Sequence, residues 1–82
     1  MARPNLVWVI DDDRSIRWVL EKALEKAGMT VKSFDSANEI AELLDRMRPD
    51  AIITDIRMPG VSGLDLLSVI NNKAPEIPVI IT

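Results

Sequence analysis

Two strand-like runs that each stop at an aspartate constrain this chain more than any other feature. Leu6–Ile10 is five consecutive apolar residues followed by the acidic run Asp11–Asp13, and the shorter run Ala51–Thr54 is followed by Asp55. Unbroken apolar runs of this length are typical of strands buried on both faces, as in a parallel sheet. The sequence therefore places carboxylates at the carboxyl ends of two buried strands.

Apolar residues that recur at three- and four-residue steps predict three helices between four strands. The stripes are Ile16, Val19, Leu20, Ala23, Leu24 and Ala27, then Ala37, Ile40, Leu43, Leu44 and Met47, and finally Leu64, Leu67 and Ile70. The remaining strands are predicted at Met29–Phe34 and Val79–Ile81. Gly28 is expected to close the first helix, and Pro49 to stop the second.

The alternation of strands and helices predicts an α/β fold with an open parallel sheet. If the first strand pairs with the second and the third, the strand order is 2-1-3-4. Right-handed crossovers then place the first helix on one face of the sheet and the next two on the other. Met29–Phe34 is more polar than its neighbours and is predicted to be an edge strand. Asp35 and Ser36 are expected to form the turn or cap before the second helix.

Composition limits the possible functions. The chain has 82 residues, 48% of them hydrophobic and 28% charged, which predicts one globular domain over residues 1–82. A net charge of −3 without a basic tail argues against direct nucleic-acid binding. The absence of Cys and His excludes thiol nucleophiles and His-based catalysis or metal ligation. The apolar runs are too short for a membrane span, so a cytoplasmic protein is expected.

The carboxylates of the acidic run and Asp55 are expected to lie together. In open α/β sheets, ligands bind beyond the carboxyl ends of the strands at the switch point, which here lies between the first and third strands. Clustered carboxylates repel one another unless they share protons or bind a cation, and Mg²⁺ is the best match for a small set of oxygen ligands. A single aspartate such as Asp13, next to Arg14, is explained as well by helix capping.

These residues resemble the receiver domains of bacterial two-component response regulators, of the NtrC (nitrogen regulation) type. The resemblance rests on Val7–Asp13, its continuation Ser15–Leu20, the segment Thr54–Gly60 and the pair Gly63 and Leu64. It covers the whole chain. It implies a flavodoxin-like fold that lacks the final strand and the last two helices, and a parent protein that controls transcription.

The resemblance also implies a role for each acidic residue. Asp55 would be the phosphoacceptor, Asp12 and Asp55 would bind Mg²⁺ directly with the backbone carbonyl of Arg57, and Asp11 would hold the water shell of the metal. The phosphoryl donor would be a phosphohistidine on a sensor histidine kinase. Such a segment receives a phosphoryl group and is not expected to be an enzyme.

Several family features are missing or displaced. The family's switch hydroxyl stands five positions after the proline of the fourth strand, whereas Thr82 stands four after Pro78; Thr82 or the position after it could serve. The family's pairing lysine is absent. We therefore expect phosphorylation by a small donor such as acetyl phosphate to be weak or undetectable, and signalling to be impaired. We also expect self-association, as a dimer or larger assembly with exchanged elements or pairing of the fourth strand.

Other residues have a structural and a functional interpretation. Met58–Gly60 is expected to form a rigid turn, and Trp8 is expected in the core. Arg14, Arg17 and Trp18 lie on the first helix, where sensor kinases dock in this family; they are either a docking surface or ordinary solvated surface.

Two alternative functions remain open. Asp11 and Asp13 form an Asp-x-Asp pair after an apolar strand, as in haloacid-dehalogenase-like phosphatases, with Asp11 as nucleophile and Asp13 as acid. That interpretation leaves Asp55 unexplained. The second alternative is a purely structural fragment or assembly without signalling competence.

Overall fold

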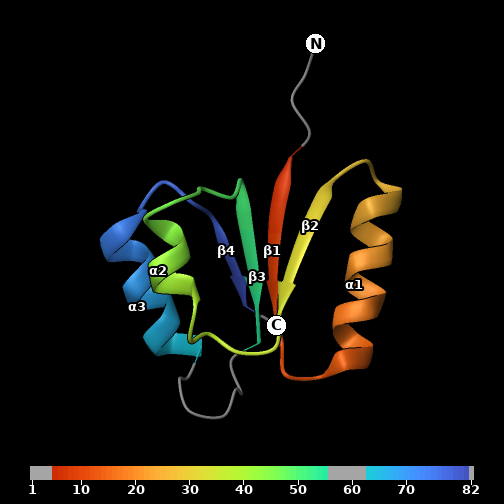
Figure 1. Cartoon of the computed structure of the whole chain (residues 1–82), viewed down its shortest axis with the longest axis horizontal. Coiled ribbons are helices and arrows are strands. Elements are labelled where there is room, and N and C mark those ends of the chain that lie inside the picture. Colours follow the sequence, from red (N-terminus) through yellow and green to blue (C-terminus); the bar gives the residue numbers. More distant parts are fainter. Residues whose placement is uncertain (1–4, 56–62, 82) are drawn as a thin grey trace.

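The computed structural model describes residues 5–55 and 63–81. Within these ranges the chain alternates strands and helices in the predicted order (Figure 1). The elements are β1 (Leu6–Ile10), α1 (Arg14–Lys26), β2 (Thr30–Phe34), α2 (Ile40–Leu44), β3 (Ala51–Thr54), α3 (Gly63–Lys73) and β4 (Val79–Ile81).

The strands form one parallel sheet in the order β2-β1-β3-β4, as the sequence predicts. Ile10, the last residue of β1, stands opposite Phe34 of β2 and Thr54 of β3. Three strands therefore finish at the same level of the sheet. The predicted edge strand, β2, has no buried residue, whereas four of the five residues of β1 are buried.

The main core lies on the sheet face that α2 and α3 cover, while α1 lies alone on the opposite face (Figure 1). Trp8 is fully buried in this core, as predicted, and its ring meets that of Phe34 edge to face with centroids 5.5 Å apart. The core comprises Trp8, Ile10, Ala37, Ile40, Leu44, Ile52, Leu66, Ile70, Ala74 and Ile77.

Helix α1 has the predicted ends but buries little of its apolar stripe. Asp13 is its N-cap, and Gly28 follows its end with a φ of 89°, in the left-handed region that glycine adopts without strain. No residue of α1 is buried, and Ile16 and Val19 are 45% and 55% exposed. The sheet therefore covers only part of the apolar stripe of α1.

Helix α2 is shorter than the sequence predicts. It runs from Ile40 to Leu44, and its N-cap residue, Glu39, makes no capping bond with its side chain. Ala37 and Met47 lie outside the helix. The hydroxyl of Ser36 accepts only a long bond, 3.5 Å, from the amide of Asn38. Asp35 and Ser36 thus lie in the bend before α2, as the turn alternative predicts, and do not cap the helix. Without a strong cap, packing of its buried residues against α3 defines the helix.

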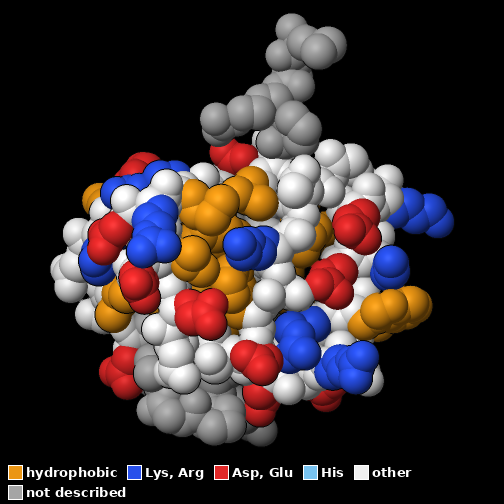
Figure 2. Space-filling view, in the orientation of Figure 1, with side chains coloured by type: hydrophobic (Ala, Val, Ile, Leu, Met, Phe, Trp, Pro, Cys, Tyr) orange, Lys and Arg blue, Asp and Glu red, His pale blue; other side chains and the backbone are white. Residues whose placement is uncertain are grey.

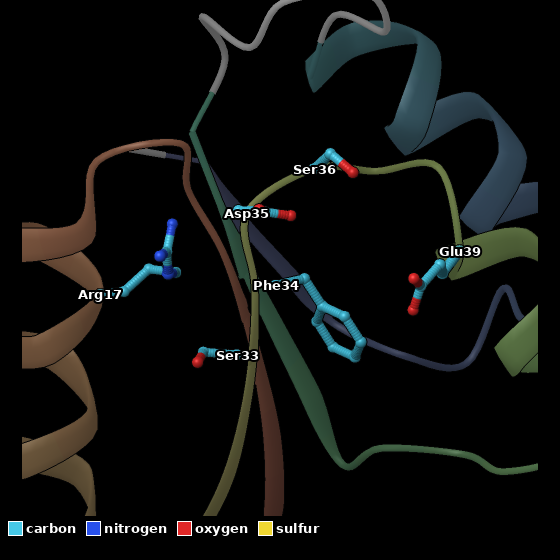
Figure 3. A pocket seen from close by; sticks show the side chains of 6 residues that line it. All are labelled: Arg17, Ser33, Phe34, Asp35, Ser36 and Glu39. Carbon is cyan, nitrogen blue, oxygen red and sulfur yellow. The ribbon is translucent and has the colours of Figure 1, made fainter.

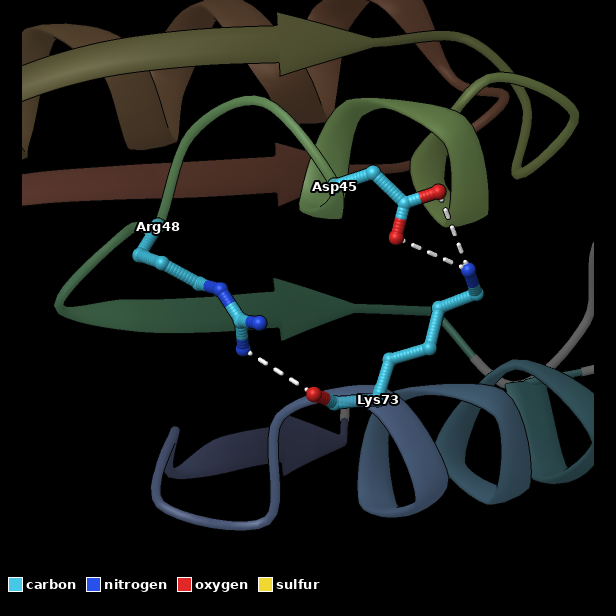
Figure 4. Close-up of polar contacts among 3 residues, drawn as sticks. All are labelled: Asp45, Arg48 and Lys73. Atoms are coloured by element: carbon cyan, nitrogen blue, oxygen red, sulfur yellow. Dashed lines mark hydrogen bonds and ion pairs between the residues drawn. The ribbon is translucent and has the colours of Figure 1, made fainter.

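Polar contacts join the end of α2 to the end of α3 at the amino-terminal edge of the sheet (Figure 4). The ammonium of Lys73 donates to both carboxylate oxygens of Asp45 at 3.0 and 3.2 Å. The guanidinium of Arg48 donates to the carbonyl of Lys73 at 3.1 Å and to the carboxylate of Glu76 at 3.2 Å. These contacts hold the two helices together far from the acidic strand ends.

The surface carries both signs of charge. On the face shown in Figure 2, acidic and basic side chains are interspersed, and apolar side chains gather between α2 and the strands. None of the described helices combines the length and the apolar character that crossing a membrane requires.

Candidate functional site

Backbone pairing places the two key aspartates next to each other. The amide of Asp11 donates to the carbonyl of Phe34 at 3.1 Å, which extends the pairing of β1 with β2 past the strand end. The amide of Asp55 donates to the carbonyl of Ile10 at 3.0 Å, which does the same for β3 and β1. The first residues after two adjacent strands thus stand side by side at the predicted switch point.

Three carboxylates meet there, as the sequence predicts. Asp11, Asp12 and Asp55 each offer an oxygen that lies within 4.8 Å of the other two. Asp11 is buried, Asp55 is half-buried and Asp12 is exposed. The site therefore opens to solvent on one side and is closed by the sheet on the other.

Asp11 is the most constrained of the three. Its side chain is 5% exposed, and one of its oxygens accepts a bond from the amide of Asp13 at 2.8 Å. Burial raises the pKa of the Asp11 carboxyl, and the charges of Asp55 and its neighbours raise it further, while the bond from Asp13 opposes the shift. The ionised site is therefore electrostatically strained without a cation.

The donor set fits a small divalent cation. All three side chains supply hard oxygen ligands, the donors that Mg²⁺ prefers, and Mg²⁺ commonly binds through one or two carboxylates while it keeps several waters. Burial is the main cause of the raised pKa of Asp11, and a cation among the oxygens would offset both this cost and the repulsion from Asp55 and Asp12.

Asp13 does not join this cluster. Its carboxylate accepts bonds from the amides of Ser15 and Ile16 at 2.8 and 3.2 Å, so it caps α1. The phosphatase alternative needs this carboxylate as an acid beside Asp11, and its engagement at the helix start contradicts that role. Capping, the structural interpretation of Asp13, is confirmed.

Two polar contacts at the site were missed in the sequence. The guanidinium of Arg17 donates to the backbone carbonyl of Asp11 at 2.6 Å, although the sequence placed Arg17 only on the outer surface of the helix. The buried hydroxyl of Thr54 donates to the carbonyl of Asp55 at 3.2 Å. Because Arg17 lies in the first turn of the helix after the acidic run, its side chain could have been expected to reach back to that run. The sequence could not have indicated which atom accepts the bond.

Some predicted residues lie outside the described ranges. These are Arg57, whose carbonyl was assigned to the metal, the turn Met58–Gly60, and Thr82. Trp18 is described and is 60% exposed on α1, with the ammonium of Lys22 6.0 Å from its ring centroid. The predicted exposure of Trp18 is thus confirmed, and its docking role stays a prediction.

Comparison with known proteins identifies the family. The model of the response regulator receiver domain matches residues 7–82. The transcriptional regulator NtrC of Salmonella typhimurium is 53% identical over 77 residues, which cover 94% of this chain but only 16% of the regulator. The chain therefore spans a small part of the curated relatives that it matches.

Solved structures agree with this result. The beryllofluoride-activated NtrC receiver domain superposes with a TM-score of 0.85 at 49% identity, over 99% of this chain and 65% of that one. The response regulator TrrA of Thermotoga maritima, solved in complex with Mg²⁺ and BeF, gives 0.87 at 28% identity over 94% of this chain and 67% of that one. A receiver fold with an acidic pocket suited to Mg²⁺ is common to these proteins and this chain. The chain belongs to the response regulator receiver domain family, and its sequence is of the NtrC type.

Proposed function

We propose that residues 1–82 form a receiver segment in which Asp55 accepts a phosphoryl group from a sensor histidine kinase. Asp11, Asp12, Asp55 and the backbone carbonyl of Arg57 would bind the Mg²⁺ that this transfer needs. The observation that carries the proposal is the meeting of three carboxylates, from the ends of two adjacent strands, within 4.8 Å.

Differences among the three carboxylates favour Asp55 as the nucleophile. A nucleophilic carboxylate must be ionised and reachable by the phosphoryl donor. Asp11 is buried, has a raised pKa and is engaged by the amide of Asp13. Asp55 is half-buried, and its backbone is fixed against Ile10, so its carboxylate is accessible yet well positioned.

The transfer is a substitution at phosphorus. An oxygen of Asp55 attacks the phosphorus atom, the bond to the imidazole nitrogen of the kinase breaks, and the imidazole leaves with the bonding electrons. The product is an acyl phosphate. When bound, Mg²⁺ supplies positive charge that offsets the phosphoryl and carboxylate oxygens. Asp11 and Asp12 would hold that charge in place.

We propose the effect of phosphorylation from the likeness of this chain to its family. Phosphorylation adds about −1.5 to −2 charges at pH 7, and the new oxygens must find donors nearby. By likeness to NtrC regulators, the segment would act in the cytoplasm and control transcription, with nitrogen regulation as the expected process. Neither DNA nor a membrane would contact this segment directly.

The surface supports a second proposal, self-association. Ile16, Val19 and Ile80 are 45%, 55% and 53% exposed on or beside the sheet face that α1 covers. Exposed apolar side chains of this size favour association when they are covered by a partner. A purely structural assembly without signalling would share this feature. Analytical ultracentrifugation should show dimers or larger species, and a stable, cooperatively folded monomer would contradict self-association.

Phosphorylation separates the receiver proposal from the alternatives. The chain is incubated with acetyl phosphate with and without Mg²⁺, and intact mass and peptide mapping follow the acyl phosphate. We expect slow, partial, Mg²⁺-dependent modification of Asp55, which Asp55→Asn removes. Modification at Asp11 would support the phosphatase alternative, and complete absence in the presence of Mg²⁺ would favour a structural role.

A further inference from the structure

We infer that Arg17 is a positioning residue for the acidic site: its bond to the Asp11 carbonyl fixes the turn that carries Asp11 and Asp12, and thereby sets the affinity for a divalent cation. The inference rests on the proposed Mg²⁺ site and goes beyond it, because it assigns a role to a residue that offers no metal ligand.

The contact is short and charged. Nη1 of Arg17 lies 2.6 Å from the backbone oxygen of Asp11, and charge-assisted bonds of this kind are stronger than neutral ones. The arginine is half-buried, so less of the bond is lost to competition with water than at an exposed position. Arginine holds such geometry with a rigid, planar fork.

Arg17 links the turn to α1 at two points. Its backbone amide donates to the carbonyl of Asp13 at 3.0 Å, while its side chain reaches back to the carbonyl of Asp11. The turn between β1 and α1 is thus held from both of its ends. Asp12, which is exposed, lies between the two anchored residues.

Three hydrogen bonds hold Asp11 in place. Its amide donates to Phe34, its carbonyl accepts from Arg17, and its carboxylate accepts from the amide of Asp13. The first bond belongs to the sheet and the third is local to the turn. Arg17 supplies the one bond among the three that comes from the side chain of another residue, so a substitution at Arg17 removes it without changing Asp11 itself.

Figure 3 shows how the side chain of Arg17 lies beside the strand ends. Its side chain extends from α1 toward the loops at the carboxyl ends of β1 and β2, on the side where Asp35 lies. It lines a polar cavity of about 340 Å³ together with Ser33, Phe34, Asp35, Ser36 and Glu39. The guanidinium thus stands at the edge of this cavity and next to the acidic site.

Positioning and simple electrostatics predict opposite results. A positive charge beside a cation site repels the cation, so removing it should strengthen Mg²⁺ binding if charge were the whole effect. Removing a positioning bond should weaken binding, because residues that orient metal ligands typically contribute about 10- to 100-fold in affinity. The direction of the change decides between the two roles.

The experiment titrates the chain with Mg²⁺ by isothermal calorimetry. Arg17→Ala should weaken binding about 10-fold, and Arg17→Lys, which keeps a charge and a donor, should recover part of the loss. Arg14→Ala is the matched control, because it removes the same charge from the exposed first turn of the same helix. Its affinity should stay unchanged or rise slightly.

A metal-free measurement tests the same bond. Hydrogen exchange at the amide of Asp13, which donates to Asp11, should speed up in Arg17→Ala and not in Arg14→Ala. Unchanged or tighter Mg²⁺ binding by a folded Arg17→Ala variant would overturn the inference. If the wild-type chain binds no Mg²⁺, or if Asp12→Asn and Asp55→Asn bind it equally well, the proposed site itself fails.

Discussion

The amide of Asp55 donates to the carbonyl of Ile10 at 3.0 Å, so the pairing of β3 with β1 continues one residue beyond both strands. This bond fixes the backbone of Asp55 against the sheet. Asp11 is placed in the same way by the carbonyl of Phe34. Substitutions of the acidic side chains should accordingly change the chemistry of the site and leave the fold intact.

Replacing Asp11 by Asn should stabilise the metal-free protein at neutral pH. The buried carboxylate is repelled by Asp55 and Asp12, and the Asn oxygen can still accept the bond from Asp13. Repulsion between two unit charges at the separation of these carboxylates, whose oxygens lie within 4.8 Å of one another, costs on the order of 1 to 3 kcal/mol, depending on the effective dielectric constant. Urea unfolding with a chelator should show a higher midpoint, and a lower one would contradict the account.

The same carboxyl should make stability depend on pH. Because the pKa of Asp11 is raised above its ordinary value of 3.8, the folded state binds more protons than the unfolded state between the two pKa values. The contribution to stability is complete below 3.8 and is lost as pH rises through the folded pKa. The free energy of unfolding of the wild type should therefore fall relative to Asp11→Asn across this window. A parallel pH profile for the two proteins would show that the pKa of Asp11 is not raised.

The cap of α1 should have a measurable effect on stability. Asp13 accepts bonds from the amides of Ser15 and Ile16, and loss of such a cap typically costs about 0.5 to 2 kcal/mol. Asp13→Ala should lower the free energy of unfolding by about this amount, whereas Asp13→Asn should retain most of it. Equal losses in both variants would mean that the charge of Asp13, and not its cap, stabilises the helix.

The ion pair between α2 and α3 should contribute little and should respond to salt. Lys73 and Asp45 lie 3.0 Å apart, but their side chains are 37% and 63% exposed. Exposed pairs typically contribute about 0 to 1 kcal/mol. Lys73→Ala should therefore lower stability by less than about 1 kcal/mol, and high salt should shrink the difference. Lys22→Ala, at a more exposed and longer pair, serves as the control. A large, salt-independent loss would indicate that packing of the lysine stem matters more than its charge.

The sheet and the acidic site could be predicted because both depend on backbone pattern. Leu6–Ile10 is an unbroken apolar run, and Ala51–Thr54 is three apolar residues followed by a threonine. Parallel strands bring their carboxyl ends to one edge of the sheet, so Asp11, Asp12 and Asp55 were expected to come close together. Asp13 was ambiguous by spacing alone. Its two bonds to amides of α1 resolve that ambiguity.

Features that depend on side-chain geometry could not be predicted. The periodicity from Ala37 to Met47 suits a longer helix than α2, because periodicity does not report whether a cap forms at the start. The stripe of α1 is regular in sequence, yet Val19 is 55% exposed, since burial depends on what packs against the helix. The bond from Arg17 to Asp11 depends on one rotamer, which no pattern of residue types specifies.

The central claim is that one divalent ion sits between the ends of β1 and β3, and Mn²⁺ tests it most directly. Paramagnetic Mn²⁺ at substoichiometric concentration should selectively broaden the NMR amide signals of Asp12, Asp13 and Asp55, and excess Mg²⁺ should restore them. Asp55→Asn should abolish the effect. Broadening that centres on other acidic groups such as Asp45 and Glu76, or that persists in excess Mg²⁺, would contradict the claim.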